Sequence, residues 1–214
     1  MRGTGKSKRT VHIIACGVFR PALEHLRLES RYPDIRLTYL LPVLHLRPIE
    51  LSKSLKKEIT AAKKNKERVI CLYGECFPGI SDYCLSCGTG KVPGACCWEM
   101  LLGRQRFQDL LEENPGTFFL EKELVLNFKD YCMEPLELYD REIREQYFQH
   151  YHRLLYVRQP ADPDLAPKAG ELAQFLGLAL EVEDADYSYL EKEISELLKV
   201  LTGGKDDPKP ESRN

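Results

Sequence analysis

The sequence lacks the features that would place this chain in a membrane or on nucleic acid. None of its apolar runs is long enough to span a bilayer. Its first ten residues are basic and polar, without the apolar stretch of a secretory signal. The formal net charge is only −2 with a pI near 6.2, which implies no general nucleic-acid-binding surface. We therefore expect a cytoplasmic protein with neither a membrane nor a nucleic-acid partner.

Disorder is excluded as well, because 43% of the residues are hydrophobic and suffice to build a core. Cysteine, in contrast, is abundant, and five of the eight cysteines fall within residues 76–97. A cytoplasmic protein keeps its thiols reduced, so this clustering favours metal or redox chemistry over structural disulfides. The eight are Cys16, Cys71, Cys76, Cys84, Cys87, Cys96, Cys97 and Cys132.

Short apolar runs alternate with helical patterns along the chain and predict an α/β protein. The expected fold is a mostly parallel sheet with helices on both faces, a Rossmann-like three-layer arrangement. We expect a single domain over residues 11–201, with flexible tails at 1–10 and 203–214. Strands are expected at 11–15, 36–41, 68–73, 91–92, 117–120 and 178–182, and helices at 21–32, 48–62, 98–112, 135–157, 168–176 and 187–201. The intervening segment 77–94 is expected to be largely loop.

Four cysteines are predicted to meet at the carboxyl edge of this sheet, where parallel-sheet proteins build their sites. Cys16 directly follows the first strand, Cys76 follows the third, and Cys96 and Cys97 precede a helix. Thiolates near helix N-termini are stabilised by exposed N–H groups, and thiolates are the ligands of zinc and iron. We therefore predict a metal site formed by Cys16, Cys76, Cys96 and Cys97.

The remaining cysteines have different expected roles. Cys84 and Cys87 form a C-x2-C pair, which is suited either to binding a cofactor metal or to dithiol redox chemistry. Cys71, inside an apolar strand, and Cys132 are expected to be core residues. Residues 53–68 hold seven basic side chains, which form either a solvated helix face or a surface for an acidic partner protein.

Several segments, in order along the chain, resemble the domain-of-unknown-function family 1638. They are HIIACGVFRPALEHL (12–26), LPVLHLRPIEL (41–51), VICLYGEC (69–76), VPGACCWEMLLG (92–103) and ENPGTFFL (113–120). The resemblance implies cysteines at the positions of Cys16, Cys76 and Cys97, with a histidine shortly before the last. Here Cys96 stands in that region instead, which favours an all-sulfur site for zinc or an iron–sulfur cluster.

The resemblance also implies a setting, because members of this family occur in anaerobes and methanogens, often encoded near corrinoid-dependent methyltransferases. The expected function is a cysteine-ligated zinc or iron–sulfur protein that serves corrinoid-linked methyl metabolism, with a corrinoid or methyltransferase protein as partner. Two alternatives stay open. One is a non-catalytic partner-binding module with a structural metal, and the other is a thiol-redox protein. Whether the protein is an enzyme is left open by the sequence.

Overall fold

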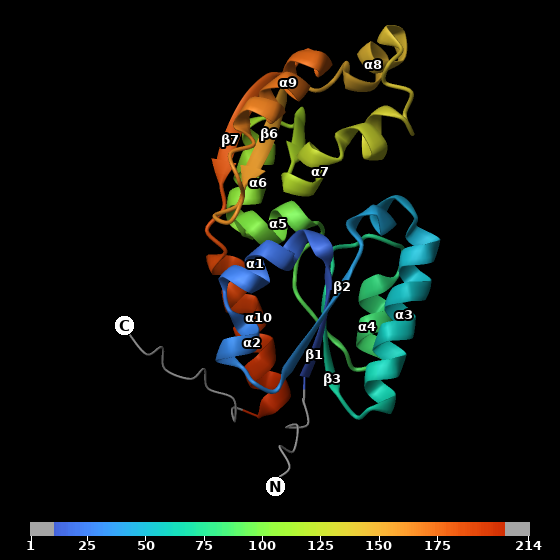
Figure 1. Cartoon of the computed structure of the whole chain (residues 1–214), viewed down its shortest axis with the longest axis vertical. Helices are drawn as coiled ribbons and strands as arrows, with labels where there is room; N and C mark the ends of the chain where they lie inside the picture. The colour runs from blue at the N-terminus through green and yellow to red at the C-terminus, as the bar shows by residue number, and fades with distance from the viewer. Residues whose placement is uncertain (1–10, 204–214) are drawn as a thin grey trace, which may run out of the picture. The chain divides into compact units, whose positions relative to one another are not determined.

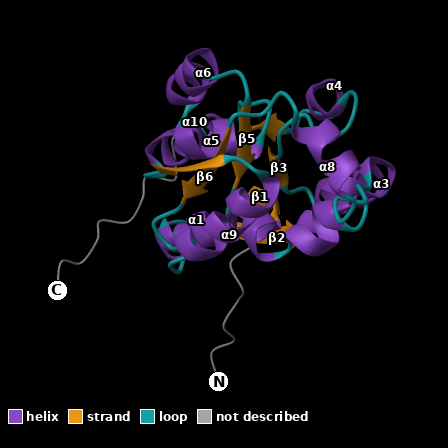
Figure 2. Ribbon diagram, turned by 90° about the horizontal axis from the view of Figure 1, so that it is seen from above, coloured by secondary structure: helices purple, strands orange, loops and turns teal. Residues whose placement is uncertain are grey.

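The computed structural model describes residues 11–203, so the predicted tails lie outside the described range except for Gly203. The chain divides into two compact units, unit 1 (residues 1–95 and 191–214) and unit 2 (residues 96–190). Each unit contains an all-parallel sheet with helices packed against it (Figures 1 and 2). This confirms the predicted α/β class, and the expectation of one domain stays a prediction. Within residues 11–203 no helix is both long and apolar enough to cross a membrane.

The sheet of unit 1 has strand order β2-β1-β3-β4, and all neighbouring strands are parallel. Helices lie on both faces of this sheet: Figure 1 shows α3 and α4 on one side and α1, α2 and α10 on the other. This is the three-layer, Rossmann-like arrangement predicted from the sequence. The elements are β1 (Val11–Cys16), α1 (Arg20–His25), α2 (Leu28–Arg31), β2 (Ile35–Leu40), α3 (Pro48–Lys64), β3 (Arg68–Leu72), α4 (Ile80–Ser86), β4 (Gly90–Lys91) and α10 (Ser188–Thr202), of which the residues from 191 onward belong to unit 1.

One face of this sheet packs on α3 and α4 to form a hydrophobic core. Ile14 of β1 lies beside Cys71 of β3 in the parallel register, so both side chains point to the same face. They meet Leu55 and Ile59, which lie four residues apart on α3 and are fully buried. The two-residue repeat of the strands and the 3.6-residue repeat of α3 therefore place apolar side chains from both kinds of element in one core.

Unit 2 has a smaller parallel sheet with strand order β5-β6-β7. Its central strand β6 is buried over its first five residues. The elements are α5 (Cys97–Leu102), α6 (Arg104–Glu113), β5 (Thr117–Leu120), α7 (Lys122–Leu126), the π-helix η3 (Lys129–Met133), α8 (Arg141–Phe148), β6 (Arg153–Arg158), α9 (Ala166–Leu176) and β7 (Ala179–Asp184). The helix predicted at 168–176 and the strand predicted at 178–182 correspond to α9 and β7.

The long helix predicted at 135–157 is wrong. The segment forms turns, then α8 and then β6, because Asp140 caps α8 at its start and helix geometry ends after Phe148. The helical spacing of Ile143, Tyr147 and Leu154 suggested continuity. Pairing of β6 with strands on both sides satisfies its backbone groups and buries its apolar side chains, and this outweighs the local periodicity.

Three further boundaries differ from the prediction. The predicted loop at 77–94 contains helix α4 as well as β4. The helix predicted at 98–112 breaks at Gly103, whose φ of +82° separates α5 from α6. The helix predicted at 21–32 breaks at Arg27, which has a left-handed φ of +49° between α1 and α2. A positive φ ends helical hydrogen bonding in both places, and only the glycine gives a signal for it in the sequence.

The side chain of Arg153 makes three polar contacts inside unit 2. Its Nε donates a hydrogen bond to Thr117 Oγ1 at 2.7 Å, and its Nη2 donates one to the carbonyl of Leu110 at 2.7 Å. Its Nη1 forms an ion pair with Glu181 at 2.6 Å. Since the guanidinium is almost fully buried, these bonds connect α6 to all three strands of the sheet.

Candidate thiol site at the sheet edge of unit 1

Cys16 and Cys76 lie at the carboxyl edge of the unit 1 sheet, as the sequence predicts for each of them. Cys16 is the last residue of β1, and Cys76 is in the loop after β3. The register pairs Ala15 with Leu72, so Tyr73, one residue beyond β3, comes level with Cys16. Both cysteines are half-buried and pack against the core under α3 and α4. The fold therefore brings these two predicted ligands to the same end of the sheet.

The hydroxyl of Tyr73 is the most unusual polar group at this edge. The side chain is only 2% exposed, and its oxygen has no hydrogen-bond partner among the described residues. Burial raises the pKa of Tyr73 well above its ordinary value, and the nearby sulfurs of Cys16, Cys71 and Cys76 raise this pKa further. The phenol therefore keeps its proton and offers a hydrogen-bond donor in sulfur-rich surroundings, where an unsatisfied buried group costs stability.

Glu75 fixes the loop that carries Cys76. Its backbone N–H donates to the carbonyl of Ala95 at 2.7 Å, and its carboxylate accepts a hydrogen bond from Ser81 at 2.5 Å. Lys91 completes the arrangement with an ion pair to Glu75 at 3.0 Å. Although burial acts to raise the pKa of Glu75, the bonds from Ser81 and Lys91 hold it below its ordinary value. The loop therefore has a defined conformation, because three separate contacts hold it.

The other two predicted ligands, Cys96 and Cys97, belong to unit 2. Cys96 precedes α5 and Cys97 is its first residue, so both lie at a helix start as expected. The expected electrostatic effect is not found at Cys96, since burial raises the pKa of its thiol in spite of backbone N–H groups from Glu99 and Trp98. Within residues 11–203 no group of three or more His, Cys, Asp or Glu side chains is arranged to hold a metal ion. The four-cysteine site stays a prediction.

The C-x2-C pair lies at the end of α4, with Cys84 inside the helix and Cys87 directly after it. Cys87 shares a 3.2 Å hydrogen bond with the Thr89 hydroxyl and donates a weaker one, at 3.4 Å, to the carbonyl of Cys84. Cys84 is buried in the same core as Cys71 of β3. The interaction between the two thiols, followed by burial, raises the pKa of Cys71 well above its ordinary value. The same interaction, with the ammonium of Lys91, lowers the pKa of Cys84 in spite of burial. Cys71 is buried, as expected.

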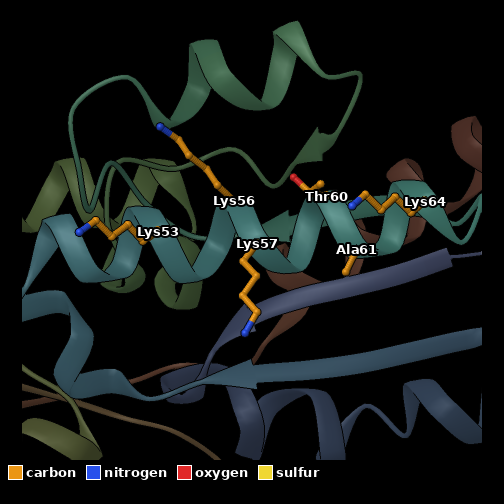
Figure 3. Close-up of a pocket in the computed structure, with 6 residues that line it drawn as sticks. All are labelled: Lys53, Lys56, Lys57, Thr60, Ala61 and Lys64. Carbon is orange, nitrogen blue, oxygen red and sulfur yellow. The ribbon is translucent and has the colours of Figure 1, made fainter.

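A stripe of lysines runs along the exposed face of α3. Figure 3 shows six side chains around an open depression of about 510 Å³, with the small residues at its centre. Lys56 leans over the ring of Tyr83, with its Nζ 5.0 Å from the ring centre. None of the four lysines forms an ion pair with a carboxylate of the described residues. The six residues are Lys53, Lys56, Lys57, Thr60, Ala61 and Lys64, and we call them together the lysine stripe.

The charge of the chain is unevenly distributed between the units. Unit 1 has 22 lysines and arginines against 14 aspartates and glutamates, a formal charge of +8. Unit 2 has 9 against 19, a formal charge of −10. The small net charge of the chain therefore hides a basic unit, and the lysine stripe is a concentrated part of its positive surface.

The carboxyl edge of the unit 2 sheet holds polar residues that the sequence did not reveal. Tyr156 donates a 2.8 Å hydrogen bond to Asp162, which also accepts one from the backbone N–H of Gln159 at 3.0 Å. The Tyr187 hydroxyl donates to the Gln159 side chain at 3.2 Å. Gln159 Nε2 and Asp162 Oδ1 have no partner among the described residues. No motif marks these residues, since each is an ordinary residue near the end of a strand.

Glu121 lies at the same edge, directly after β5. Its carboxylate caps α7 by accepting hydrogen bonds from the backbone N–H groups of Glu123, at 2.8 Å, and Leu124, at 3.0 Å. The side chain is 3% exposed, and burial raises its pKa to about 7 although the two N–H groups oppose this shift. A carboxyl group of unit 2 therefore titrates near neutrality.

The fold and these residues define an α/β protein with two parallel sheets and a thiol-rich sheet edge in its first unit. The chain belongs to the family described as protein of unknown function (DUF1638), whose family model matches residues 39–194. This confirms the resemblance seen in the sequence. The matched segment includes Cys76, Cys96 and Cys97, and begins after Cys16. No curated protein and no solved structure matches the chain.

Proposed function

We propose that this protein binds a thiophilic metal centre, zinc or an iron–sulfur cluster, through cysteines at the carboxyl edge of unit 1. Cys16 and Cys76 are the proposed ligands in this unit, and Cys96 and Cys97 of unit 2 are the further predicted ligands. The observation that supports the proposal is the buried Tyr73 hydroxyl, which is unpaired among the described residues and lies near Cys16 and Cys76. A phenol in this position suits a hydrogen bond to a metal-bound thiolate.

The available donors fit such a centre in their chemistry. Thiolates favour zinc, copper(I) and iron–sulfur clusters over magnesium or calcium. When bound, zinc would supply Lewis acidity that activates a substrate thiol, whereas a cluster would supply electron transfer. Tyr73 would hold its proton and donate it in a hydrogen bond to sulfur. Glu75 would keep Cys76 in place through its bonds to Ser81 and Lys91.

The decisive measurement is the metal content and visible spectrum of anaerobically purified protein. We expect stoichiometric zinc in a colourless protein, or iron with absorption near 400 nm in a brown one. Cys16→Ala and Cys76→Ala should each lose most of the metal. Cys132→Ala is the matched control, because Cys132 is a half-buried cysteine of unit 2 outside the proposed set, and it should keep the metal. Wild-type protein without metal would overturn the proposal.

The variants Cys96→Ala and Cys97→Ala test the ligands of unit 2 separately. Loss of metal in either variant would support its place in the ligand set. Full retention in both would restrict the centre to unit 1 and to ligands not yet identified. Chelation separates a functional from a structural metal, because removing a structural metal unfolds the chain. Unfolding on chelation would favour the alternative of a non-catalytic module.

We also propose that the protein serves corrinoid-linked methyl metabolism by binding a corrinoid or methyltransferase protein. The family resemblance motivates this setting, and the lysine stripe on α3 supports an acidic partner. Lys53 and Lys57 are like charges at an i, i+4 spacing, which weakens a helix by a few tenths of a kcal/mol. Thr60 and Ala61 between the lysines would let a partner helix approach closely.

This surface is tested by measuring the affinity for an acidic corrinoid protein at 50 and 500 mM salt. The triple variant Lys53→Glu, Lys57→Glu, Lys64→Glu should lose the salt-sensitive binding. A matched triple variant in unit 2, at Lys122, Lys129 and Lys168, makes the same change in charge and should keep it. Equal loss in both variants would mean that net charge alone matters, and no salt-sensitive binding by the wild type would overturn this part of the proposal.

A further inference from the structure

The outward face of α3 begins with an exposed isoleucine. Ile49, in the first turn of the helix, is 72% exposed, whereas Leu55 and Ile59 on the opposite face are buried in the core. Residues four apart lie on one side of a helix, so Ile49 is followed on its own face by Lys53 and Lys57 of the lysine stripe. This face of α3 is therefore apolar at its start and basic further along.

Two more apolar side chains are exposed directly before this helix. Leu41 precedes the short 3-10 helix η2 (Pro42–Leu46) and Leu46 ends it, and these two leucines are 68% and 44% exposed. Leu44, between them, packs against the hydrophobic core of unit 1, and its backbone N–H donates a hydrogen bond to the carbonyl of Leu41 at 3.1 Å. The turn is therefore anchored by Leu44 and leaves its other leucines in solvent. Together with Ile49, we call Leu41 and Leu46 the apolar end.

The apolar end lies at the same edge of the unit 1 sheet as Cys16. Cys16 is paired with Leu40 in the parallel register of β1 and β2, and Leu41 is the next residue. The turn after Cys16 lies against η2, because a Cβ atom on Gly17 would lie only 2.8 Å from Cδ of Pro42. Glycine permits this close approach, which a larger residue would prevent. A molecule that covers the apolar end therefore comes to the edge that carries the proposed unit 1 metal ligands.

Three exposed lysines of the same face form no ion pair with a carboxylate of the described residues. They are Lys53, Lys57 and Lys64. The nearby carboxylate of Glu50 is paired with Arg47 instead, at 3.5 Å. A row of uncompensated positive charges attracts carboxylates, whereas the apolar end gains only from apolar contact. A complementary surface is therefore acidic over most of its length and apolar at one end.

The dimensions of this face fit a helix. From Ile49 to Lys64 the face extends for about 22 Å, which is roughly four helical turns at 1.5 Å per residue. Thr60 and Ala61 lie among the lysines (Figure 3), and their small side chains let a second helix approach to an axis separation of about 8–10 Å. A single-stranded nucleic acid, which is charged along its whole length, would leave the apolar end uncovered. Shape and charge together therefore favour a helix as the occupant.

We propose that the apolar end and the lysine stripe together dock an amphipathic helix of a partner protein. Carboxylates of this helix face the lysines, and one or two of its large apolar side chains cover the apolar end. This rests on the acidic partner of the proposed function and states the form of that partner's binding segment. Because the apolar end lies at the edge that carries Cys16, docking brings the partner to the thiols.

The test measures binding of a labelled helical peptide to the full-length chain by fluorescence anisotropy at 50 and 500 mM salt. The peptide has about four turns, glutamates at the spacing of the three lysines and two leucines at one end, and a second version has the order reversed. Leu46→Ser, Ile49→Ser should weaken binding of the better peptide roughly 10- to 100-fold at both salt concentrations, because apolar burial is not screened by salt. The matched control Leu85→Ser, Val200→Ser removes two exposed apolar side chains elsewhere in unit 1 and should bind like the wild type.

Several results would overturn the proposal. One is equal affinity of the wild type and Leu46→Ser, Ile49→Ser, and another is equal binding of a peptide with the same composition in scrambled order. Tighter binding of a single-stranded oligonucleotide of equal charge would assign the surface to nucleic acid instead. A wild-type dimer in sedimentation that Leu46→Ser, Ile49→Ser disperses would assign it to a second copy of the chain.

The same variants separate this surface from the rest of the proposed function. Salt-sensitive binding of an acidic corrinoid protein, with equal affinity for the wild type and Leu46→Ser, Ile49→Ser, would overturn the helix-docking surface alone. Binding of the peptide as expected, without binding of the corrinoid protein, would overturn the corrinoid partner alone. The metal content should be the same in the wild type and in Leu46→Ser, Ile49→Ser, because neither residue is a proposed ligand.

Discussion

Arg36 donates a 2.7 Å hydrogen bond to Nδ1 of His12, so the fully buried imidazole is neutral and this nitrogen is a hydrogen-bond acceptor. Its Nε2 donates to the hydroxyl of Thr38 at 2.8 Å. Glu67 lies 3.6 Å from Nδ1, but its carboxylate is engaged by Arg36 at 2.6 Å. Burial, with Arg36 as the second cause, lowers the pKa of His12 from 6.5 to about 4.

This network predicts acid sensitivity in unit 1. Because the folded pKa of His12 lies below its unfolded value, the contribution to stability is complete above pH 6.5 and is lost as the pH falls to about 4. The full loss is about 3 kcal/mol. His12→Asn should therefore be less stable than the wild type at pH 7 and lose less stability between pH 6.5 and 4, measured by urea unfolding. An unchanged pH slope in this variant would contradict the assignment to His12.

Glu121 predicts the opposite pH dependence in unit 2. Its folded pKa of about 7 lies above the ordinary value of 4.5, so its contribution is complete below pH 4.5 and is lost as the pH rises through 7. The size is again about 3 kcal/mol. In Glu121→Gln, stability should rise more steeply with pH over this range than in the wild type. If instead the wild type and Glu121→Gln show parallel pH profiles, Glu121 does not titrate near neutrality.

The two residues together test whether the units form one cooperative domain. If unit 1 and unit 2 unfold in a single transition, the opposite effects of His12 and Glu121 on the pH dependence of stability largely cancel in the wild type. His12→Asn then shows the pH dependence due to Glu121, and Glu121→Gln shows the one due to His12. If the units unfold separately, two transitions appear with opposite pH dependence. Circular dichroism and tryptophan fluorescence distinguish the cases, because the single tryptophan, Trp98, reports on unit 2.

Arg153 provides a comparison of buried and exposed ion pairs. Arg153→Met should destabilise the protein by roughly 3 kcal/mol, because it leaves Thr117 and the carbonyl of Leu110 without their buried partner. Arg158→Met, which removes an exposed pair with Asp184 on the same strands, should cost at most about 1 kcal/mol. Thermal and urea unfolding measure both variants. Similar losses would show that the buried hydrogen bonds of Arg153 are not what stabilises this sheet.

Much of unit 1 could be predicted from the sequence because its signals are local. The buried strand at 68–73 and the apolar spacing of Leu51, Leu55 and Ile59 each indicate their element directly. The prediction of a helix at 135–157 is wrong because the determining signal is not local. The strand β6 forms through its pairing with β5 and β7, which are distant from it in the sequence.

The candidate site likewise has features that the sequence predicted and features that it did not. Strand ends located Cys16 and Cys76 correctly, because parallel strands all have their carboxyl ends at the same edge of the sheet. The burial of Cys84 in the core beside β3 was not predictable, since it depends on how α4 docks on the sheet. The unpaired hydroxyl of Tyr73 was equally hidden, because satisfaction of a buried polar group is a property of its three-dimensional neighbours.

Tyr73→Phe tests the link between the unpaired hydroxyl and the proposed metal centre. Without metal, removing a buried hydroxyl that lacks a partner should leave stability unchanged or raise it by about 1 kcal/mol. With metal, loss of the hydrogen bond to sulfur should weaken metal affinity about 10- to 100-fold. Competition with a chromophoric chelator measures the affinity, and urea unfolding of the metal-free protein measures the stability.

Tyr39→Phe, which also removes a buried hydroxyl without a hydrogen-bond partner in the described structure, is the control and should leave the affinity unchanged. Equal metal affinity in Tyr73→Phe and the wild type would show that the phenol does not serve the metal centre.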